Sequence, residues 1–194
     1  MNLTTKLYGK YRLSKASDEA IFERYGHSLS VALTAVDLVK RFDRDDLIEK
    51  AFVAGVLHDY AKFLSNDQYE FLIEKYNLDN SLLKEGRKTW HGKIGVYAVI
   101  DELDITDSEI IGAIKYHVVG RPDMSFLEKV IYVADYIEPM RIGNQYETAR
   151  KYAFEDLDKA VAIIAKSVYE YLRSSGCETL GETYETFCFY QKYL

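Results

Sequence analysis

Cysteine and proline are scarce in this chain of 194 residues, which contains two of each. Cys177 and Cys188 lie near the C-terminal end without a CxxC pattern, and there are no further cysteines to build a disulfide framework. We therefore expect both to be ordinary reduced thiols. Because only Pro122, Pro139 and eleven glycines interrupt the chain, the sequence favours long helices over many short strands.

Long apolar runs and a basic net charge are also absent. No stretch approaches the ~20 apolar residues that a membrane helix needs, and no apolar segment of a signal peptide follows the basic start MNLTTKLYGKYRLS. We expect a cytoplasmic protein without a membrane partner. The net charge of −6 argues against a nucleic-acid partner, which would need a basic face, but not against a small anion held by metal ions.

Helical periodicity is what the chain does contain. In residues 26–42, His27, Val31, Ala35 and Leu38 fall on one stripe at helical spacing. Similar patterns predict helices over residues 105–117, 125–139 and 154–176, with loops near 77–91 and 139–148. The chain is therefore predicted to be an all-α bundle.

Local signals mark the expected ends of some helices. A helix through Leu57 is predicted to begin with a cap and first-turn acids at Asp43, Asp45 and Asp46. The helix over 105–117 opens with Thr106 and an acid in capping-box spacing. The last segment is predicted to dock as a helix on the bundle or on a second subunit, through Tyr184, Phe187, Gln191 and Leu194.

A histidine and an aspartate, His58 and Asp59, follow directly on the apolar run AFVAGVL. Burying these side chains without partners costs several kcal/mol, so other parts of the chain should satisfy them. All four histidines fall at or next to a predicted helix end. One such histidine is usually a core residue with a hydrogen-bond partner, but four indicate a shared site. The candidate residues occur in the order His27, His58, Asp59, His91, His117, Asp135.

This order, H…HD…H…H…D, resembles the HD-domain superfamily of metal-dependent phosphohydrolases. The strings RYGHSLSVA, GVLHDYAK, WHGKIGVYAV, AIKYHVVG and VIYVADYIEPMR are more narrowly similar to the bacterial YqeK family, over about residues 20 to 170. The resemblance implies a single HD-domain helical bundle over 1–194, with a metal-binding core at about 20–140 and C-terminal helices at about 145–194. It implies symmetrical hydrolysis of diadenosine tetraphosphate to two ADP.

The resemblance also implies a dinuclear metal centre. The expected ligands form two groups that share a bridge: His27, His58, Asp59 and Asp135 for one ion, and His91 and His117 with Asp59 for the second. Imidazoles and carboxylates together suit iron, manganese, zinc or nickel better than magnesium or calcium. The use of iron by the family makes iron the first candidate. Water bound between the ions would be the nucleophile.

Several basic residues are candidates for substrate contact. Lys62 matches the lysine of the HDxxK string of the family and is expected to contact a phosphate oxygen as a catalytic residue, although a salt bridge to a ligand carboxylate is the alternative. Arg141 and Arg150 match basic positions near the nucleotide, or are solvated surface charges. Arg121 is a weaker candidate. Val118 departs from the threonine that usually follows the fourth histidine of the family.

Two other functions are compatible with these residues. One is an HD-type nucleotidase or nucleotide phosphodiesterase with the same metals, and the other is a non-catalytic HD protein that binds a nucleotide. The intact ligand set argues against the second. In each case the partner is a dinucleoside polyphosphate or another nucleotide, with an ADP- or GDP-like product. Most of the 17 tyrosines are expected to pack in the core or in a homodimer interface rather than to stack on bases.

Overall fold

A computed structural model describes residues 2–176 and 181–194, and every regular element in this part of the chain is a helix. With η denoting a 3₁₀ helix, the elements are α1 (Leu3–Arg12), α2 (Asp18–Arg41), η1 (Asp45–Leu47), α3 (Ile48–Leu57), α4 (Asn66–Lys75), η2 (Asn80–Lys84), η3 (Arg87–Thr89), α5 (Trp90–Lys93), α6 (Val96–Leu103), α7 (Ser108–Tyr116), α8 (Phe126–Ile137), α9 (Asn144–Ala153), α10 (Leu157–Ser174), α11 (Gly181–Tyr190) and η4 (Gln191–Tyr193). The predicted all-α class is confirmed.

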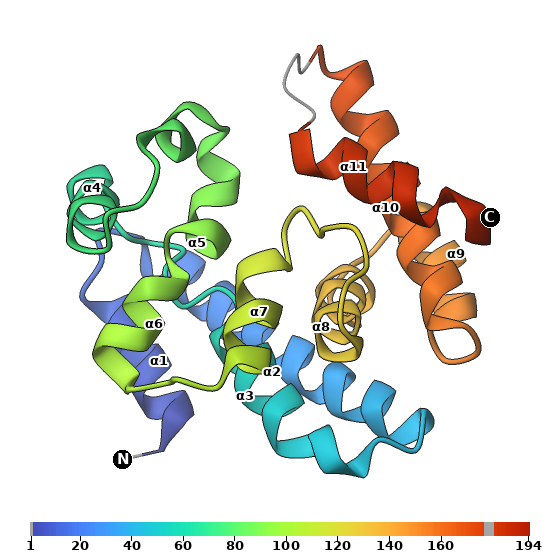
Figure 1. The fold of residues 1–194 in the computed structure, drawn as a ribbon. Coiled ribbons are helices and arrows are strands. Elements are labelled where there is room, and N and C mark those ends of the chain that lie inside the picture. The colour runs from blue at the N-terminus through green and yellow to red at the C-terminus, as the bar shows by residue number, and fades with distance from the viewer. Residues whose placement is uncertain (1, 177–180) are drawn as a thin grey trace.

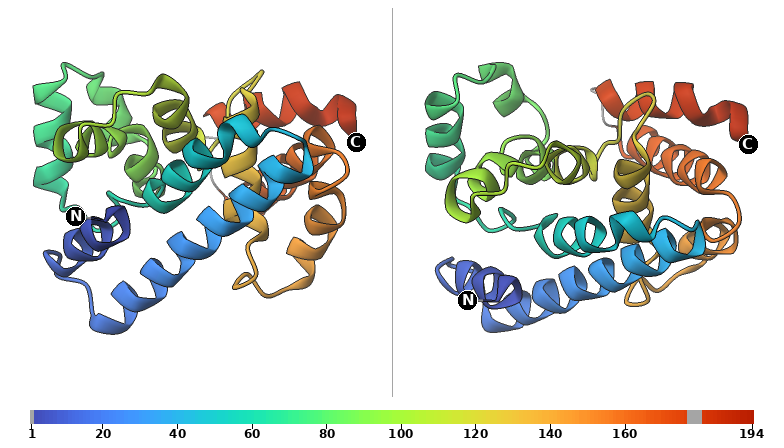
Figure 2. Two further views of the ribbon diagram at one scale, coloured as in Figure 1. Left: turned by 90° about the horizontal axis from the view of Figure 1, so that it is seen from below. Right: turned by 60° about the horizontal axis from the view of Figure 1, so that its bottom comes forward.

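Four helices, α2, α3, α7 and α8, form the middle of the molecule. They separate α4, α5 and α6 on one side from α9, α10 and α11 on the other (Figure 1). The long helix α2 runs beside α3 in both further views, and the two chain ends lie on opposite sides of the molecule (Figure 2). The core cluster of buried apolar side chains includes residues of all four central helices.

The contact between α2 and α3 is unusually close because of one glycine. A Cβ atom at Gly55 would lie 2.5 Å from the Cα of Ala32, so a larger residue there would push the helices apart. This contact brings the end of α3 next to the middle of α2. It thereby sets His58, directly after α3, beside His27.

Two predicted helix starts are wrong in detail. Asp43 has a φ of 54° and lies in the turn after α2, and neither η1 nor α3 has a side-chain cap. The cap of α7 is Asp107 rather than Thr106, because the Asp107 carboxylate accepts hydrogen bonds from the backbone N–H groups of Glu109 and Ile110. A carboxylate in this position also interacts favourably with the helix dipole.

The last helix, α11, docks on the bundle by a face that differs from the predicted one. Thr186 donates its hydroxyl to the carbonyl of Val119 at 2.9 Å, and the hydroxyl of Tyr190 accepts the N–H of Met124 at 2.8 Å. With Thr183, these are the buried residues of the helix. Part of the predicted docking face is exposed instead, at Tyr184 and Leu194.

The predicted loops are only partly irregular. Residues 77–91 contain η2 and η3, and the prediction of a loop over 139–148 is wrong from Asn144, where α9 begins. Cys188 is half-buried in α11, whereas Cys177 lies outside the described residues. Among the described helices, none combines the length and apolar character that crossing a bilayer requires.

Candidate metal centre

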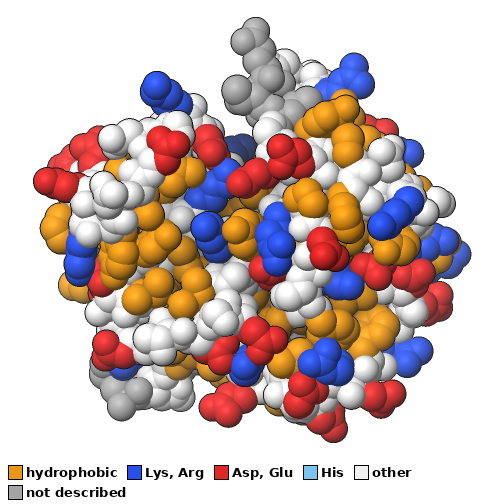
Figure 3. All heavy atoms as spheres, in the orientation of Figure 1, with side chains coloured by type: hydrophobic (Ala, Val, Ile, Leu, Met, Phe, Trp, Pro, Cys, Tyr) orange, Lys and Arg blue, Asp and Glu red, His pale blue; other side chains and the backbone are white. Residues whose placement is uncertain are grey.

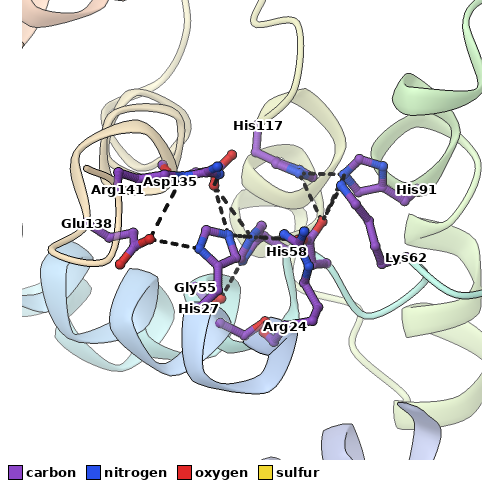
Figure 4. A network of polar contacts seen from close by, with 12 residues as sticks. Arg24, His27, Gly55, His58, Lys62, His91, His117, Asp135, Glu138 and Arg141 are labelled. Carbon is purple, nitrogen blue, oxygen red and sulfur yellow. Dashed lines mark hydrogen bonds and ion pairs between the residues drawn. The ribbon is translucent and has the colours of Figure 1, made fainter. Parts of the chain in front are cut away.

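The six predicted ligand side chains lie close together, although they come from five helical segments. Figure 4 shows His27, His58, His91, His117 and Asp135 pointing toward one another. The segments contribute His27 from α2, His58 and Asp59 after α3, His91 from α5, His117 after α7 and Asp135 from α8. The prediction that every histidine lies near a helix end is wrong for His27. Because Ser17 caps α2 well before it, this histidine lies in the interior of a long helix.

Asp59 is buried, and its two carboxylate oxygens face different histidines. Oδ2 lies 3.4 Å from Nε2 of His58 and 3.9 Å from Nε2 of His27. Oδ1 lies 2.9 Å from Nε2 of His91 and 3.8 Å from Nε2 of His117. A carboxylate between two pairs of imidazoles has the arrangement that a bridging ligand requires.

The second carboxylate, Asp135, approaches one pair of histidines. Its Oδ1 lies 3.0 Å from Nε2 of His27 and 3.9 Å from Nε2 of His58. Neighbouring ligand atoms on one ion lie roughly 3 to 3.5 Å apart when the metal–ligand bonds are ~2.1 Å. The ligand atoms of Asp135, His58 and His117 also lie within 4.8 Å of one another, so His58 is within reach of both groups of ligands.

Hydrogen bonds orient three of the four imidazole rings. His58 and His117 each have Nδ1 2.7 Å from the backbone carbonyl three residues earlier, which can only accept a hydrogen bond. Nδ1 of His27 lies 3.1 Å from the carboxylate of Glu138. A neutral ring that donates from Nδ1 has a free lone pair on Nε2. This tautomer is the one that binds a metal through Nε2.

The arrangement leaves an electrostatic conflict that a cation would remove. The Nε2 atoms of His27 and His58 are 3.2 Å apart, and in neutral rings that donate from Nδ1 both carry lone pairs. Oδ1 of Asp59 is buried and has no hydrogen-bond partner among the described residues. Because buried groups without partners are costly, these residues fit a divalent metal, and their imidazole and carboxylate donors suit a transition metal.

Burial and charge shift the pKa values of the cluster. Burial lowers the pKa of His91 and that of His117, so both rings are neutral at pH 7. Burial alone would raise the pKa of Asp59, but attraction to His58 and to the ammonium group of Lys62 holds it well below its usual range. For His58, burial lowers the pKa and Asp59 raises it, with a net upward shift. His91, His117 and Asp59 are therefore already in the unprotonated form that binds a metal, and a proton released on metal binding would come from His58.

Two residues of the site were missed in the sequence. Arg24 donates from Nη1 to Oδ2 of Asp59 at 2.6 Å, and Glu138 is buried against His27. Arg24 precedes His27 by three residues in α2, and Glu138 follows Asp135 by three. Residues three apart tend to share a helix face, so this spacing places both near a predicted ligand, but their contact with the cluster depends on the tertiary structure.

Two of the predicted substrate-binding cations contact the cluster. Nζ of Lys62 lies 3.3 Å from Oδ1 of Asp59 and 3.2 Å from Nε2 of His91. Arg141 donates from Nη2 to Oδ1 of Asp135 at 2.8 Å. Both side chains are about one-third exposed, so they contact the predicted ligands and solvent at once. Their contact with substrate stays a prediction.

Arg150 and Arg121 have other partners. Arg150 donates to three backbone carbonyls, including those of Ile137 and Glu138 at 2.8 and 2.9 Å, and so holds the turn after α8. Arg121 forms an ion pair of 2.9 Å with Glu128. The distances give Arg150 a structural role, and the prediction that it binds substrate has no support from them.

Two cavities open beside the cluster. The first, of about 560 Å³, is lined by His27, Phe63 and Met140 among others, and we call it the Phe63 cavity. The second, of about 470 Å³, is lined by His91 and His117 among others, and we call it the His117 cavity. Each has the size of a small-molecule site.

Cations line these cavities, although the chain as a whole is acidic. Arg24, Lys62 and Arg141 line both cavities, and Lys88 lines the His117 cavity. Lys88 has no ion pair or hydrogen bond of its side chain within the described ranges. On the face in Figure 3, several Lys and Arg side chains surround the hollow near the middle. Such a concentration of positive charge suits a polyanionic ligand.

Comparisons with known proteins agree with this geometry. The family model described as HD domain matches residues 24–140. The chain is 38% identical over 164 residues to the symmetrical bis(5'-nucleosyl)-tetraphosphatase of Bacillus subtilis, covering 84% of this chain and 87% of that protein. It is 35% identical to the protein of the same name from Staphylococcus aureus, covering 87% of each.

A solved structure extends the likeness to the whole fold. The crystal structure of a predicted HD superfamily hydrolase involved in NAD metabolism from Clostridium acetobutylicum matches 98% of this chain and 97% of its own, with a TM-score of 0.81 and 30% identity. The ligand cluster, the family match and these relatives lead to one assignment. The chain belongs to the HD-domain family of metal-dependent hydrolases, in the group of the symmetrical bis(5'-nucleosyl)-tetraphosphatases.

Proposed function

We propose that this protein hydrolyses diadenosine tetraphosphate symmetrically to two ADP. The observation that carries the proposal is the cluster around Asp59, in which one buried carboxylate faces two pairs of histidines beside two cavities lined by cations. The names of the relatives at 35–40% identity supply the substrate class, a bis(5'-nucleosyl) tetraphosphate.

We further propose two transition-metal ions, with iron as the first candidate and manganese, zinc or nickel as alternatives. The proposed ligands are His27, His58, Asp59 and Asp135 for one ion, and His91, His117 and Asp59 for the other. Ions in such a site lower the pKa of bound water and polarise the phosphoryl group under attack. The low pKa of Asp59 keeps its carboxylate ionised and therefore able to bridge.

The side chains around the cluster position the substrate. Arg24, Lys62 and Arg141 line both cavities, and this places positive charge where the Phe63 cavity and the His117 cavity meet. A tetraphosphate seated there would extend one nucleoside toward each cavity. Its second phosphorus would then lie at the cluster. Lys62 contacts the transferring phosphoryl oxygens in this proposal and offsets their charge.

The reaction balances as a simple hydrolysis. The oxygen of one water forms a bond to the second phosphorus, and the bond from that phosphorus to the central bridging oxygen breaks. The bridging oxygen leaves on the other half as the terminal oxygen of ADP, and the protons of the water are released to solvent. Each half of the substrate thus becomes one ADP.

The test is a nucleotide panel assayed with protein reconstituted with iron, manganese or zinc, in water labelled with ¹⁸O. We expect only ADP from diadenosine tetraphosphate, with the label on the terminal phosphate of one ADP in each pair. ATP with AMP would show asymmetric cleavage and contradict the proposal. Rapid release of phosphate from nucleoside monophosphates, without cleavage of the tetraphosphate, would indicate a nucleotidase. Binding without turnover would indicate a non-catalytic protein.

A further inference from the structure

A third cavity, of about 420 Å³, adjoins the His117 cavity, and none of the described residues that line it carries a charge. We call it the tyrosine cavity, and its lining residues are Tyr136, Gln145, Tyr146, Ser167, Val168 and Tyr171. Tyr136 and Val168 line both cavities, so the tyrosine cavity lies next to the space beside the predicted ligands. The lining changes from cationic in the His117 cavity to aromatic in the tyrosine cavity.

The aromatic rings of the tyrosine cavity come from three helices and are partly held in place. Tyr136 directly follows Asp135 in α8, and its hydroxyl lies 3.0 Å from Oγ of Ser167 in α10. The ring of Tyr146 in α9 packs edge-on against Tyr136 with centroids 4.9 Å apart. Tyr171 in α10 is 62% exposed, which leaves its ring available at the rim. Aromatic rings at such a site are platforms on which a planar base can stack.

Gln145 contributes the one carboxamide among the described residues that line this cavity, and this group presents a donor and an acceptor side by side. The carboxamide of Gln145 makes no hydrogen bond within the described residues, and it lies over Gly143, where a Cβ would be 2.5 Å from Oε1 of Gln145. The φ of 143° at Gly143 also disfavours any other residue. A carboxamide pairs with the N6 and N7 positions of adenine, which present one donor and one acceptor. Guanine presents two acceptors there.

We propose that the tyrosine cavity binds the adenine base of one half of the substrate, with Tyr171 stacking on the base and Gln145 selecting adenine over guanine. The proposal rests on the proposed function because the phosphates are taken to lie at the metal centre. The uncharged lining suits a neutral heterocycle, whereas the phosphates would meet Arg24, Lys62 and Arg141 in the adjoining cavity. These features make Gln145 a specificity-determining residue.

The experiment measures equilibrium binding of ADP, GDP and tripolyphosphate to the metal-reconstituted full chain by calorimetry. Tripolyphosphate has no base, so it reports on the phosphate site alone. We expect Tyr171→Ala to weaken ADP binding about 10-fold, within the range measured for base stacking on aromatic residues, and to leave tripolyphosphate binding unchanged. We expect wild type to bind ADP more tightly than GDP, and Gln145→Leu to reduce that preference about 10-fold.

Phe71→Ala is the matched control, since Phe71 is 59% exposed on α4, on the opposite side of the molecule. We expect it to leave all three affinities unchanged. Unchanged ADP binding in Tyr171→Ala, or equal losses for ADP and tripolyphosphate, would overturn the base site. Equal wild-type affinities for ADP and GDP would overturn the role of Gln145. Failure of the proposed function would give a different result, because wild type would then not cleave the tetraphosphate.

Discussion

The two halves of the candidate metal centre are supported very differently. The His27 half, formed by His27, His58 and Asp135, stands on the long helices α2 and α8 and on the end of α3. Both of its imidazoles are oriented through Nδ1, by Glu138 and by a backbone carbonyl. The side chains of this half therefore hold a ligand geometry before any ion binds.

The His91 half, formed by His91 and His117, rests on a shorter scaffold. His91 lies in α5, which has four residues and follows η2 and η3. Within the described chain, Nδ1 of His91 has no hydrogen bond, whereas His117 is oriented by a carbonyl. Gly92 in α5 compensates in part, because a Cβ there would lie 3.0 Å from the backbone carbonyl oxygen of Lys115, so α5 packs closely on α7.

This difference teaches that one cluster of candidate ligands can combine a preorganised half with a half whose side chains are held by fewer contacts. Partners that orient ligand histidines typically contribute 10- to 100-fold in metal affinity. If each half holds one ion, as proposed, we therefore expect the ion of the His27 half to bind more tightly than that of the His91 half. The following variants test this asymmetry.

Asp59→Ala should have the largest effect, because Asp59 provides the carboxylate shared by both halves. The His27 half would keep Asp135, whereas the His91 half would keep only its two histidines. We expect wild type to carry close to two ions per chain, and the variant about one, with turnover reduced at least ~10²-fold. Metal analysis and initial rates give the readout, with the exposed Asp37→Ala in α2 as control. Fewer than one ion in reconstituted wild type would contradict the two-ion site.

Glu138→Gln should remove much of the higher metal affinity that we expect of the His27 half. The change weakens the acceptor for Nδ1 of His27, so we expect about 10-fold lower affinity for the tighter ion. In a titration with a competing chelator, wild type should release metal in two phases at different chelator concentrations. In the variant, these two concentrations should lie closer together. Glu170→Gln, exposed on α10, serves as control. An unchanged tight phase would show that Glu138 does not support this half.

Lys62→Ala tests the cation next to the His91 half. If Lys62 contacts phosphate, we expect both ions to be retained and kcat to fall about 10-fold, because charge that develops on phosphate loses its partner. Loss of metal with unchanged chemistry in the remaining holoenzyme would instead support the salt bridge to Asp59. Lys75→Ala, on α4, is a suitable control because its ion pair with Asp101 involves none of the predicted ligands.

Gly55→Ala should have the smallest effect, because it changes the scaffold of the His27 half rather than a ligand. Its methyl group would clash with the Cα of Ala32, and overpacking of this kind lowers the free energy of unfolding by about 1–3 kcal/mol. We expect Tm to fall by several °C, at roughly 2–4 °C per kcal/mol for a chain of this size. Gly9→Ala is the matched control, since nothing lies within 4 Å of its Cβ position. Equal Tm values for the two variants would contradict close packing of α2 on α3.

Helix class and ligand order were readable from the sequence, whereas local details were not. The stripe through His27 predicted a helix, but its start at Asp18 was missed, so His27 seemed to lie near an end. The cap of α7 was assigned to Thr106 instead of Asp107 because both residues are good caps. Two neighbouring residues with similar capping propensity differ too little in free energy for the sequence pattern to show which of them caps the helix.

The sequence by itself determined the all-α class, since apolar spacing is a local property that α-helices satisfy within one segment. It also contained the six candidate ligands in order. Only the tertiary structure decided that Arg24 and Glu138 join them, that Arg150 holds a backbone turn, and that uncharged and cationic cavities adjoin. The physical reason is that these relations depend on distances between side chains far apart in the chain, which close packing of helices such as α2 on α3 sets.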